Sequence, residues 1–266
     1  MQNNTIKVLF IGDIFGRPGR EIVKDFLSSN RDKYDVIIAN CENASSGKGL
    51  TPNNLEELLS FGIDALTSGN HIWSKKEIIP YLNKDYPLLR PLNYPKDAPG
   101  RGSIIFPTKK NVKIGLINLQ GRVFMQAIDC PFRVGYEEIL KLKQSTNIII
   151  VDFHAEATSE KAALSYYLNG LISALLGTHT HVQTNDAMIL SKGSAYITDV
   201  GMCGPNESII GVDIDTIIDT YLTGVPKRFE VAKSDVFQLD YVEIEIDTES
   251  GRALSIANKH ELYNRK

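Results

Sequence analysis

Side chains able to bind metal ions follow five apolar stretches of this sequence. In chain order they are Asp13, Glu42, Asn43, Asn70, His71, His154, His179 and His181. Carboxylate, amide and imidazole groups together form a ligand set for first-row metal cations. Since no cysteine belongs to the set, the residues do not match a cysteine-rich structural zinc site. The chemistry these residues predict is therefore that of a catalytic metal centre.

Each of these residues alone has a simpler explanation. An aspartate after a strand often caps a turn, the Gly-Asn dipeptide is common in turns, and a single histidine is often structural. Their joint occurrence favours a metal site, because four of the five histidines lie in these segments and only His260 lies outside. His179 and His181 are two residues apart, so an extended chain would place both rings on the same side.

The elements that must position these residues alternate between strand and helix patterns. Strands are expected at 7–11, 35–39, 64–67, 113–119, 147–153 and 172–176, a hairpin at 187–190 and 195–198, and a strand pair at 242–247 and 253–256. Helices are expected at 20–27, after Thr51-Pro52, after a capping box at Ser74, at 159–168 and at 213–222. This order predicts an α/β fold with a largely parallel sheet. Ligands of such sheets bind beyond the carboxyl ends of the strands, where the polar residues fall.

One proline-rich segment interrupts this alternation. Six of the eleven prolines lie between Pro80 and Pro107, which predicts a long irregular excursion. The sequence leaves open whether the excursion is a lid, a substrate wall or an oligomer contact. No repeat or linker divides the chain, so residues 1–266 are expected to form a single domain.

Composition places the chain among cytoplasmic globular proteins. The net charge of −3 gives no field for bulk binding of nucleic acid or anionic membrane, although a specific nucleotide ligand stays compatible with it. Three cysteines without CxxC spacing argue against a disulfide framework. No signal peptide or membrane-spanning stretch is expected. Whether the chain forms a homo-oligomer is left open.

Five motifs resemble those of the calcineurin-like metallophosphoesterases, and more closely their YmdB-like branch, a group of bacterial phosphodiesterases. They are Ile11-Gly-Asp-Ile-Phe-Gly-Arg17, Cys41-Glu-Asn-Ala44, Ser68-Gly-Asn-His71, Asp152-Phe-His-Ala155 and Gly177-Thr-His-Thr-His-Val182. The wider superfamily usually has histidine where Phe15 stands and a bridging aspartate where Glu42 stands. The YmdB-like branch shares both changes, and the loss of one imidazole leaves the metal pair open.

The resemblance implies a four-layer sandwich of two packed mixed sheets flanked by helices, and a dinuclear centre. One metal ion would take Asp13, Glu42, Asn43 and His181. The other would take Glu42, Asn70, His154 and His179. Iron or manganese is favoured and zinc is the alternative. Two such cations would lower the pKa of a bridging water, and the resulting hydroxide would attack phosphorus.

The resemblance also implies a role for His71, beside the ligand Asn70. It would stabilise the phosphate or protonate the leaving group, as suits a side chain that titrates near neutrality. The competing interpretation is a hydrogen-bond donor behind the metal ligands. Asn43 could likewise contact a substrate oxygen instead of metal. Five further residues are weaker candidates for substrate binding: Arg17, Lys48, Trp73, Arg101 and Arg122.

The expected function is that of a phosphodiesterase acting on cyclic nucleotides, and the family favours 2′,3′-cyclic nucleotides. A phosphomonoesterase or 5′-nucleotidase on the same site is the first alternative. A regulatory protein that senses nucleotides without turnover is the second, although a binding relic need not retain all the metal ligands.

Overall fold

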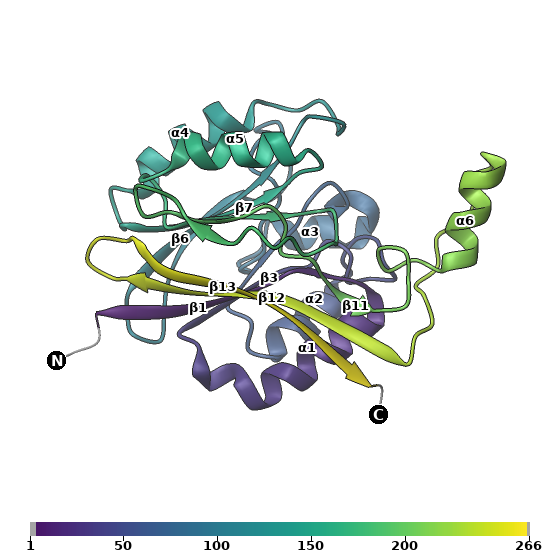
Figure 1. Ribbon diagram of the computed structural model, residues 1–266. Helices are drawn as coiled ribbons and strands as arrows, with labels where there is room; N and C mark the ends of the chain where they lie inside the picture. Colours follow the sequence, from purple (N-terminus) through teal and green to yellow (C-terminus); the bar gives the residue numbers. More distant parts are fainter. Residues whose placement is uncertain (1–3, 265–266) are drawn as a thin grey trace.

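Two mixed β-sheets pack against each other at the centre of the protein. The computed structural model describes residues 4–264 (Figure 1). The first sheet contains β1 (Thr5–Ile11), β2 (Asp13–Ile14), β3 (Val36–Asn40), β4 (Ala65–Thr67), β11 (Met202–Pro205), β12 (Val236–Asp247) and β13 (Ala253–Asn264). The second contains β5 (Ser103–Pro107), β6 (Lys113–Gln120), β7 (Ile148–His154), β8 (Ala174–Thr178), β9 (Met188–Ile189) and β10 (Ala195–Ile197). Apolar side chains of both sheets, such as Phe10 and Ile150, form one buried core between them.

Helices cover the outer face of each sheet. α1 (Gly16–Asn30) and α2 (Pro52–Ser60) pack on the first sheet, and α4 (Pro131–Leu142) and α5 (Thr158–Leu168) pack on the second (Figure 1). The predicted α/β fold with two packed sheets and flanking helices is confirmed. All residues of β3 and β7 are buried, which is why each strand begins with a continuous apolar run, at 36–39 and 148–151.

The segment after His71 differs from the prediction. The expected capped helix at Ser74 is wrong: two 3-10 turns, η2 (Ile72–Ser74) and η3 (Lys76–Ile78), lead into the short α3 (Ile79–Leu82) without a side-chain cap. Pro80 has no N–H to donate to a preceding turn, so an α-helix cannot run through it and instead begins at Ile79, with Pro80 in its first turn. α4, β5 and β11 have no counterpart among the elements predicted from the sequence.

The proline-rich segment lies along the edges of the two sheets. The Leu66 N–H donates to the Pro87 carbonyl (2.7 Å), and the Leu89 N–H donates to the Leu66 carbonyl (2.8 Å), which extends the first sheet beyond β4. β5 pairs antiparallel with β6 at the edge of the second sheet. The excursion therefore covers strand edges that would otherwise be unpaired.

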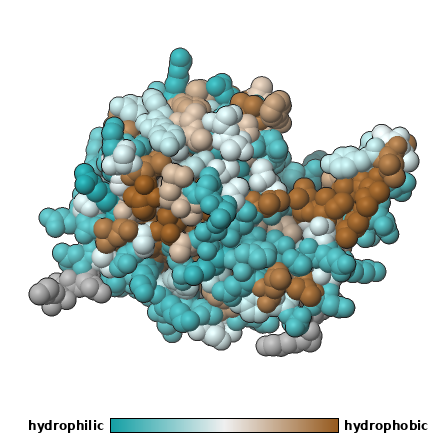
Figure 2. Space-filling model, in the orientation of Figure 1, coloured by the Kyte–Doolittle hydropathy of each residue, from teal (hydrophilic) through white to brown (hydrophobic). Residues whose placement is uncertain are grey.

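One helix stands away from the body. α6 (Ile214–Thr223) projects from the two sheets, and apolar side chains line this arm (Figures 1 and 2). Tyr221 is 83% exposed and Leu222 is 81% exposed. Within residues 4–264, no helix combines the length and apolar character needed to cross a membrane.

Candidate metal centre

The polar residues at the five strand ends converge where the two sheets meet. Strands β1, β3 and β4 are parallel in the first sheet, and β6, β7, β8 and β10 are parallel in the second. The sequence pattern suggested a single rim, but the site joins the carboxyl ends of strands from both sheets. Glu42, which follows β3, contacts His154 at the end of β7, and this contact joins the two sheets at the site.

Glu42, His154 and His179 form the centre of the cluster. His154 Nε2 lies 3.1 Å from Glu42 Oε1 and 3.0 Å from His179 Nδ1. One candidate ligand atom from each residue lies within 4.8 Å of the other two. This spacing allows the three side chains to share a single cation.

The electrostatics of this centre keep a negative charge on Glu42. Burial opposes that charge, but the imidazoles of His154 and His71 outweigh it and hold the pKa of Glu42 well below its usual range. Burial likewise opposes the charge of His154, yet Glu42 raises the pKa of His154 to about 9. Burial, and then the positive charge of His154, lowers the pKa of His179 to about 3, so its nitrogen keeps a lone pair. The centre thus offers an anionic oxygen and a neutral imidazole to a cation.

Two buried oxygens near this centre lack a hydrogen-bond donor. Among the described residues, Asp13 Oδ1 and Asn70 Oδ1 have no partner, as do the amide nitrogens of Asn118 and Gln120. Burial raises the pKa of Asp13 well above its usual range. An unsatisfied buried acceptor is destabilising, and a bound cation would satisfy both oxygens. The residues therefore fit the metal ions that the sequence predicts.

Gly69 lets the chain after β4 approach this centre closely. A Cβ atom at Gly69 would lie 2.1 Å from His154 Cδ2 and 2.4 Å from Glu42 Oε2, which no side chain could tolerate. The next two residues are Asn70 and His71, and the His71 N–H donates to Glu42 Oε2 (3.1 Å). The predicted ligand Asn70 is thus held between two contacts with Glu42.

Asn43 connects His71 to the rest of the cluster. Its Oδ1 accepts from His71 Nδ1 (2.8 Å), and its Nδ2 donates to Glu42 Oε1 (3.2 Å). The same Nδ2 lies 3.0 Å from His181 Nε2. In this arrangement the carboxamide oxygen faces His71, so coordination of a metal by Asn43 would require the amide to turn over.

His179 and His181 reach the site through left-handed backbone, and not through an extended strand. β8 ends at Thr178, and φ is 104° at His179 and 65° at His181. Such values are strained for residues other than glycine and persist where the surroundings enforce them, often at functional sites. His181 Nδ1 donates to the Ile210 carbonyl (2.9 Å), which turns Nε2 toward Asn43. Burial lowers the pKa of His181, which favours its neutral form.

Phe15, which stands where the wider superfamily has histidine, packs against a predicted ligand. It is 4% exposed, and its ring meets the His181 ring edge-on, with centroids 5.5 Å apart. Replacing an imidazole by this phenyl ring removes a ligand but fills the space beside His181.

Two residues that the sequence pattern did not single out, Thr178 and Asp152, orient His154. His154 Nδ1 donates to Thr178 Oγ1 (2.9 Å), and Thr178 Oγ1 donates to Asp152 Oδ1 (2.7 Å). With Nδ1 engaged in this relay, Nε2 is the nitrogen that faces Glu42 and that a metal ion would use, an arrangement common behind metal-binding histidines. Burial raises the pKa of Asp152 to about 6. Both residues lie inside the motifs quoted above, which was the available signal.

A buried ion pair supports the loop that carries His179 and His181. Lys161 Nζ on α5 lies 2.7 Å from Asp199 Oδ2, and both side chains are at most 1% exposed. The backbone N–H groups of Thr180 and Gly201 also donate to Asp199. Asp199 closely follows β10, so its position at a strand end was a signal. The burial of Lys161 had no counterpart in the sequence pattern.

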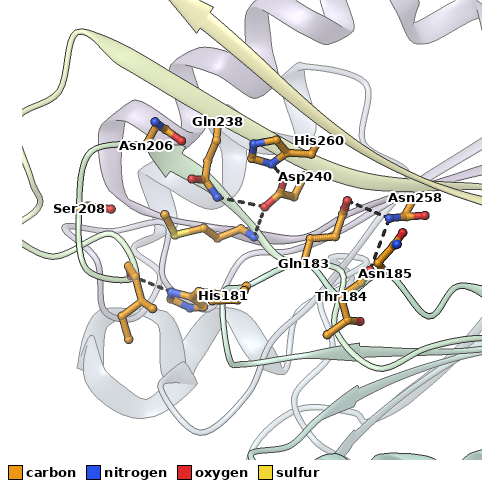
Figure 3. Close-up of a pocket in the computed structure, with 13 residues that line it drawn as sticks. His181, Gln183, Thr184, Asn185, Asn206, Ser208, Gln238, Asp240, Asn258 and His260 are labelled. Carbon is orange, nitrogen blue, oxygen red and sulfur yellow. Dashed lines mark hydrogen bonds and ion pairs between the residues drawn. The ribbon is translucent and has the colours of Figure 1, made fainter.

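His181 also borders a polar cavity of about 410 Å³ (Figure 3). Gln183 accepts from Asn258, and Gln238 and His260 both bind Asp240 (Figure 3). Burial raises the pKa of Asp240 to about 6. Gln183 also donates to the carbonyls of Val200 (2.9 Å) and Lys259 (3.0 Å), so the bonds of this cavity wall hold the chain that follows His181.

Three of the five weaker candidates for substrate binding make contacts away from the metal cluster. Arg17 pairs with Glu21 on α1 (2.6 Å), and Trp73 packs edge-on against Tyr94 with ring centroids 5.4 Å apart. Arg101 donates to the Tyr86 carbonyl and pairs with Asp85 (3.1 Å). All of these contacts are with neighbours outside the metal cluster.

Lys48 and Arg122 are exposed and lie on loops that leave the cluster. Lys48 is on the turn after Glu42, and Arg122 follows Gln120, the register partner of His154. A role of these two residues in substrate binding stays a prediction.

Comparisons with known proteins agree on one family. A family model described as YmdB-like protein matches residues 9–258. The chain is 46% identical over 253 residues to the 2′,3′-cyclic-nucleotide 2′-phosphodiesterase of Bacillus subtilis, covering 94% of this chain and 95% of that protein. A crystal structure of a novel phosphatase from Mycoplasma pneumoniae has a TM-score of 0.92 and 38% identity, covering 100% of this chain and 96% of the other. A hypothetical protein from Thermus thermophilus has a TM-score of 0.90 and 40% identity, covering 98% and 100%.

Proposed function

Since the chain belongs to the YmdB-like family, we propose that it is a metal-dependent phosphodiesterase that hydrolyses 2′,3′-cyclic nucleotides. The observation that carries the proposal is the pair of unpartnered buried oxygens, Asp13 Oδ1 and Asn70 Oδ1, beside the Glu42–His154–His179 cluster. The substrate class is that named for the Bacillus subtilis relative.

We propose two metal ions, with iron or manganese preferred because hard oxygens and imidazoles are mixed in the site. Asp13, Glu42 and His181 would hold one ion, together with Asn43 if its amide turns over. Glu42, Asn70, His154 and His179 would hold the other. When bound, the two cations would supply Lewis-acid activation of water and neutralise charge on the phosphate.

The residues of the chain then have to orient the substrate and deliver a proton. In hydrolysis the bond between phosphorus and the ribose 2′-oxygen breaks, a bond from phosphorus to the water oxygen forms, and a nucleoside 3′-phosphate results. His71 is the proposed proton donor to the 2′-oxygen. Its Nδ1 is engaged by Asn43 (2.8 Å), so Nε2 is the nitrogen left to meet the leaving oxygen.

The proposal is tested by measuring release of nucleoside monophosphate from 2′,3′-cyclic AMP by manganese-loaded protein. We expect turnover by the unchanged protein and its loss in Asp13→Asn, because the substitution removes the charge of a buried ligand. A folded, metal-loaded protein that does not turn over the diester contradicts the substrate assignment. Faster hydrolysis of 5′-AMP would favour the monoesterase, and nucleotide binding without any hydrolysis would favour the sensor.

Replacing His71 with asparagine is expected to lower kcat on 2′,3′-cyclic AMP by roughly 10²- to 10⁴-fold, the usual contribution of general acid catalysis. A diester with a nitrophenolate leaving group needs no protonation and should lose much less. Metal content, measured by mass spectrometry, should be unchanged. Equal losses on both substrates, or loss of metal, would instead identify His71 as a hydrogen-bond donor behind the ligands.

A further inference from the structure

The turn that follows β6 lies directly beside the metal cluster. β6 and β7 are neighbouring strands (Figure 1), and Gln120, the last residue of β6, pairs in register with His154 of β7. The Gly121 N–H donates to the His154 carbonyl (2.9 Å), and a Cβ atom at Gly121 would lie 2.6 Å from the Ala155 Cβ. The chain therefore leaves the sheet in contact with the backbone of a central residue of the site.

This turn is anchored although its side chains face solvent. The N–H groups of Arg122 and Val123 both donate to the carboxylate of Glu160 (3.1 Å), which is buried in the first turn of α5. The Met125 N–H closes the turn onto the Arg122 carbonyl (3.3 Å). The turn is thus a rigid support beside the site.

Phe124 is the exposed aromatic residue on this support. Its side chain is 89% exposed, and its φ of 61° lies in the left-handed region that residues other than glycine rarely adopt. An isolated exposed apolar residue needs no explanation. Phe124 is a different case. Its ring is held in solvent by strained, anchored backbone at the rim of a metal centre, and neither the exposure nor the strain stabilises the fold.

The aromatic and charged side chains of the turn match the base and the phosphate of a nucleotide. Arg122 is exposed beside Phe124, and among the described residues no carboxylate pairs with its guanidinium. An exposed ring can stack on a nucleobase, and stacking tolerates any base because every base has a π-face. The cavity beside His181 is less suited to the base, because the amides of Asn258 and Gln238 there already donate to Gln183 and Asp240.

We propose that Phe124 is the platform on which the nucleobase of the substrate stacks, with Arg122 at its side facing the anionic phosphate. This assignment rests on the proposed function, since it requires a nucleotide at the metal centre. It makes Phe124 a specificity-determining residue, which distinguishes nucleotides from phosphodiesters without a base and discriminates weakly among bases.

The test compares kcat/KM for 2′,3′-cyclic AMP with that for methyl ribofuranoside 2′,3′-cyclic phosphate, which lacks the base. In Phe124→Ala the ratio of the two values should fall roughly tenfold, the loss expected for one base–aromatic stack. Phe124→Tyr should restore the ratio. Tyr221→Ala, which removes a similarly exposed aromatic on α6, should leave it unchanged.

Titration of manganese-loaded protein with 3′-AMP and with ribose 3-phosphate provides a readout that needs no turnover. Phe124→Ala should weaken binding of 3′-AMP by roughly tenfold and narrow the difference in affinity between the two ligands. If hydrolysis fails but this difference is present and depends on Phe124, the proposed function is wrong and the stacking site stands. Asn185 lines the cavity beside His181. An unchanged ratio and unchanged 3′-AMP affinity in Phe124→Ala, or loss of the base preference in Asn185→Ala instead, would overturn the assignment.

Discussion

Glu42→Gln is expected to lower phosphodiesterase activity at least about a thousandfold, equivalent to roughly 4 kcal/mol of transition-state stabilisation. The carboxylate of Glu42 is the common neighbour of the cluster. Oε1 lies 3.1 Å from His154 Nε2, and Oε2 accepts from the His71 N–H. Glutamine keeps the shape but removes the charge that two adjacent cations require. Metal content should therefore fall together with activity.

The matched control is Glu77→Gln, the same change at an exposed position on η3. It should leave kcat/KM and metal content within error of the unchanged protein, because a solvated surface carboxylate touches neither metal nor substrate. Metal content is measured by mass spectrometry and activity on 2′,3′-cyclic AMP. A Glu42→Gln protein that retains both metal ions and activity within tenfold would rule out a bridging role for Glu42.

Lys161→Met is expected to lower the free energy of unfolding by about 3–5 kcal/mol, because it leaves Asp199 as an uncompensated buried charge. The Lys161 side chain is 0% exposed, and its Nζ lies 2.7 Å from Asp199 Oδ2. Methionine fills similar space without charge. For a chain of this size the change corresponds to a fall in Tm of roughly 10 °C.

Urea denaturation of the metal-free protein measures this effect, with Lys141→Met as the control. Lys141 pairs with Glu138 at a similar distance (2.8 Å), but its side chain is 70% exposed, so its loss should cost at most about 1 kcal/mol. The double variant Lys161→Met/Asp199→Asn should recover part of the stability, because it removes both charges of the pair. Equal destabilisation by Lys161→Met and Lys141→Met would show that the buried pair does not support the fold.

The strands were predicted best where the local sequence pattern is strong. Continuous apolar runs such as that of β7 predicted buried parallel strands, and the alternation at 242–247 lies within β12 as buried and half-buried residues in turn. The capped helix expected at Ser74 was wrong, because Pro80 prevents one continuous helix from running through this segment. A capping pattern takes no account of a proline further along the chain. Periodicity reports which face is buried, and does not report backbone breaks of this kind.

By itself, the sequence determined which side chains stand at the strand ends, since residue type and the length of each apolar run are local properties. The tertiary structure decided which of them meet. Asn40 and Asp152 are 112 residues apart and belong to different sheets, yet they are 2.9 Å apart beneath the site. The left-handed backbone at His179 and His181 and the burial of Lys161 against Asp199 also arise from packing between distant segments. No periodicity encodes such contacts, because each depends on how two sheets and a helix are brought together in space.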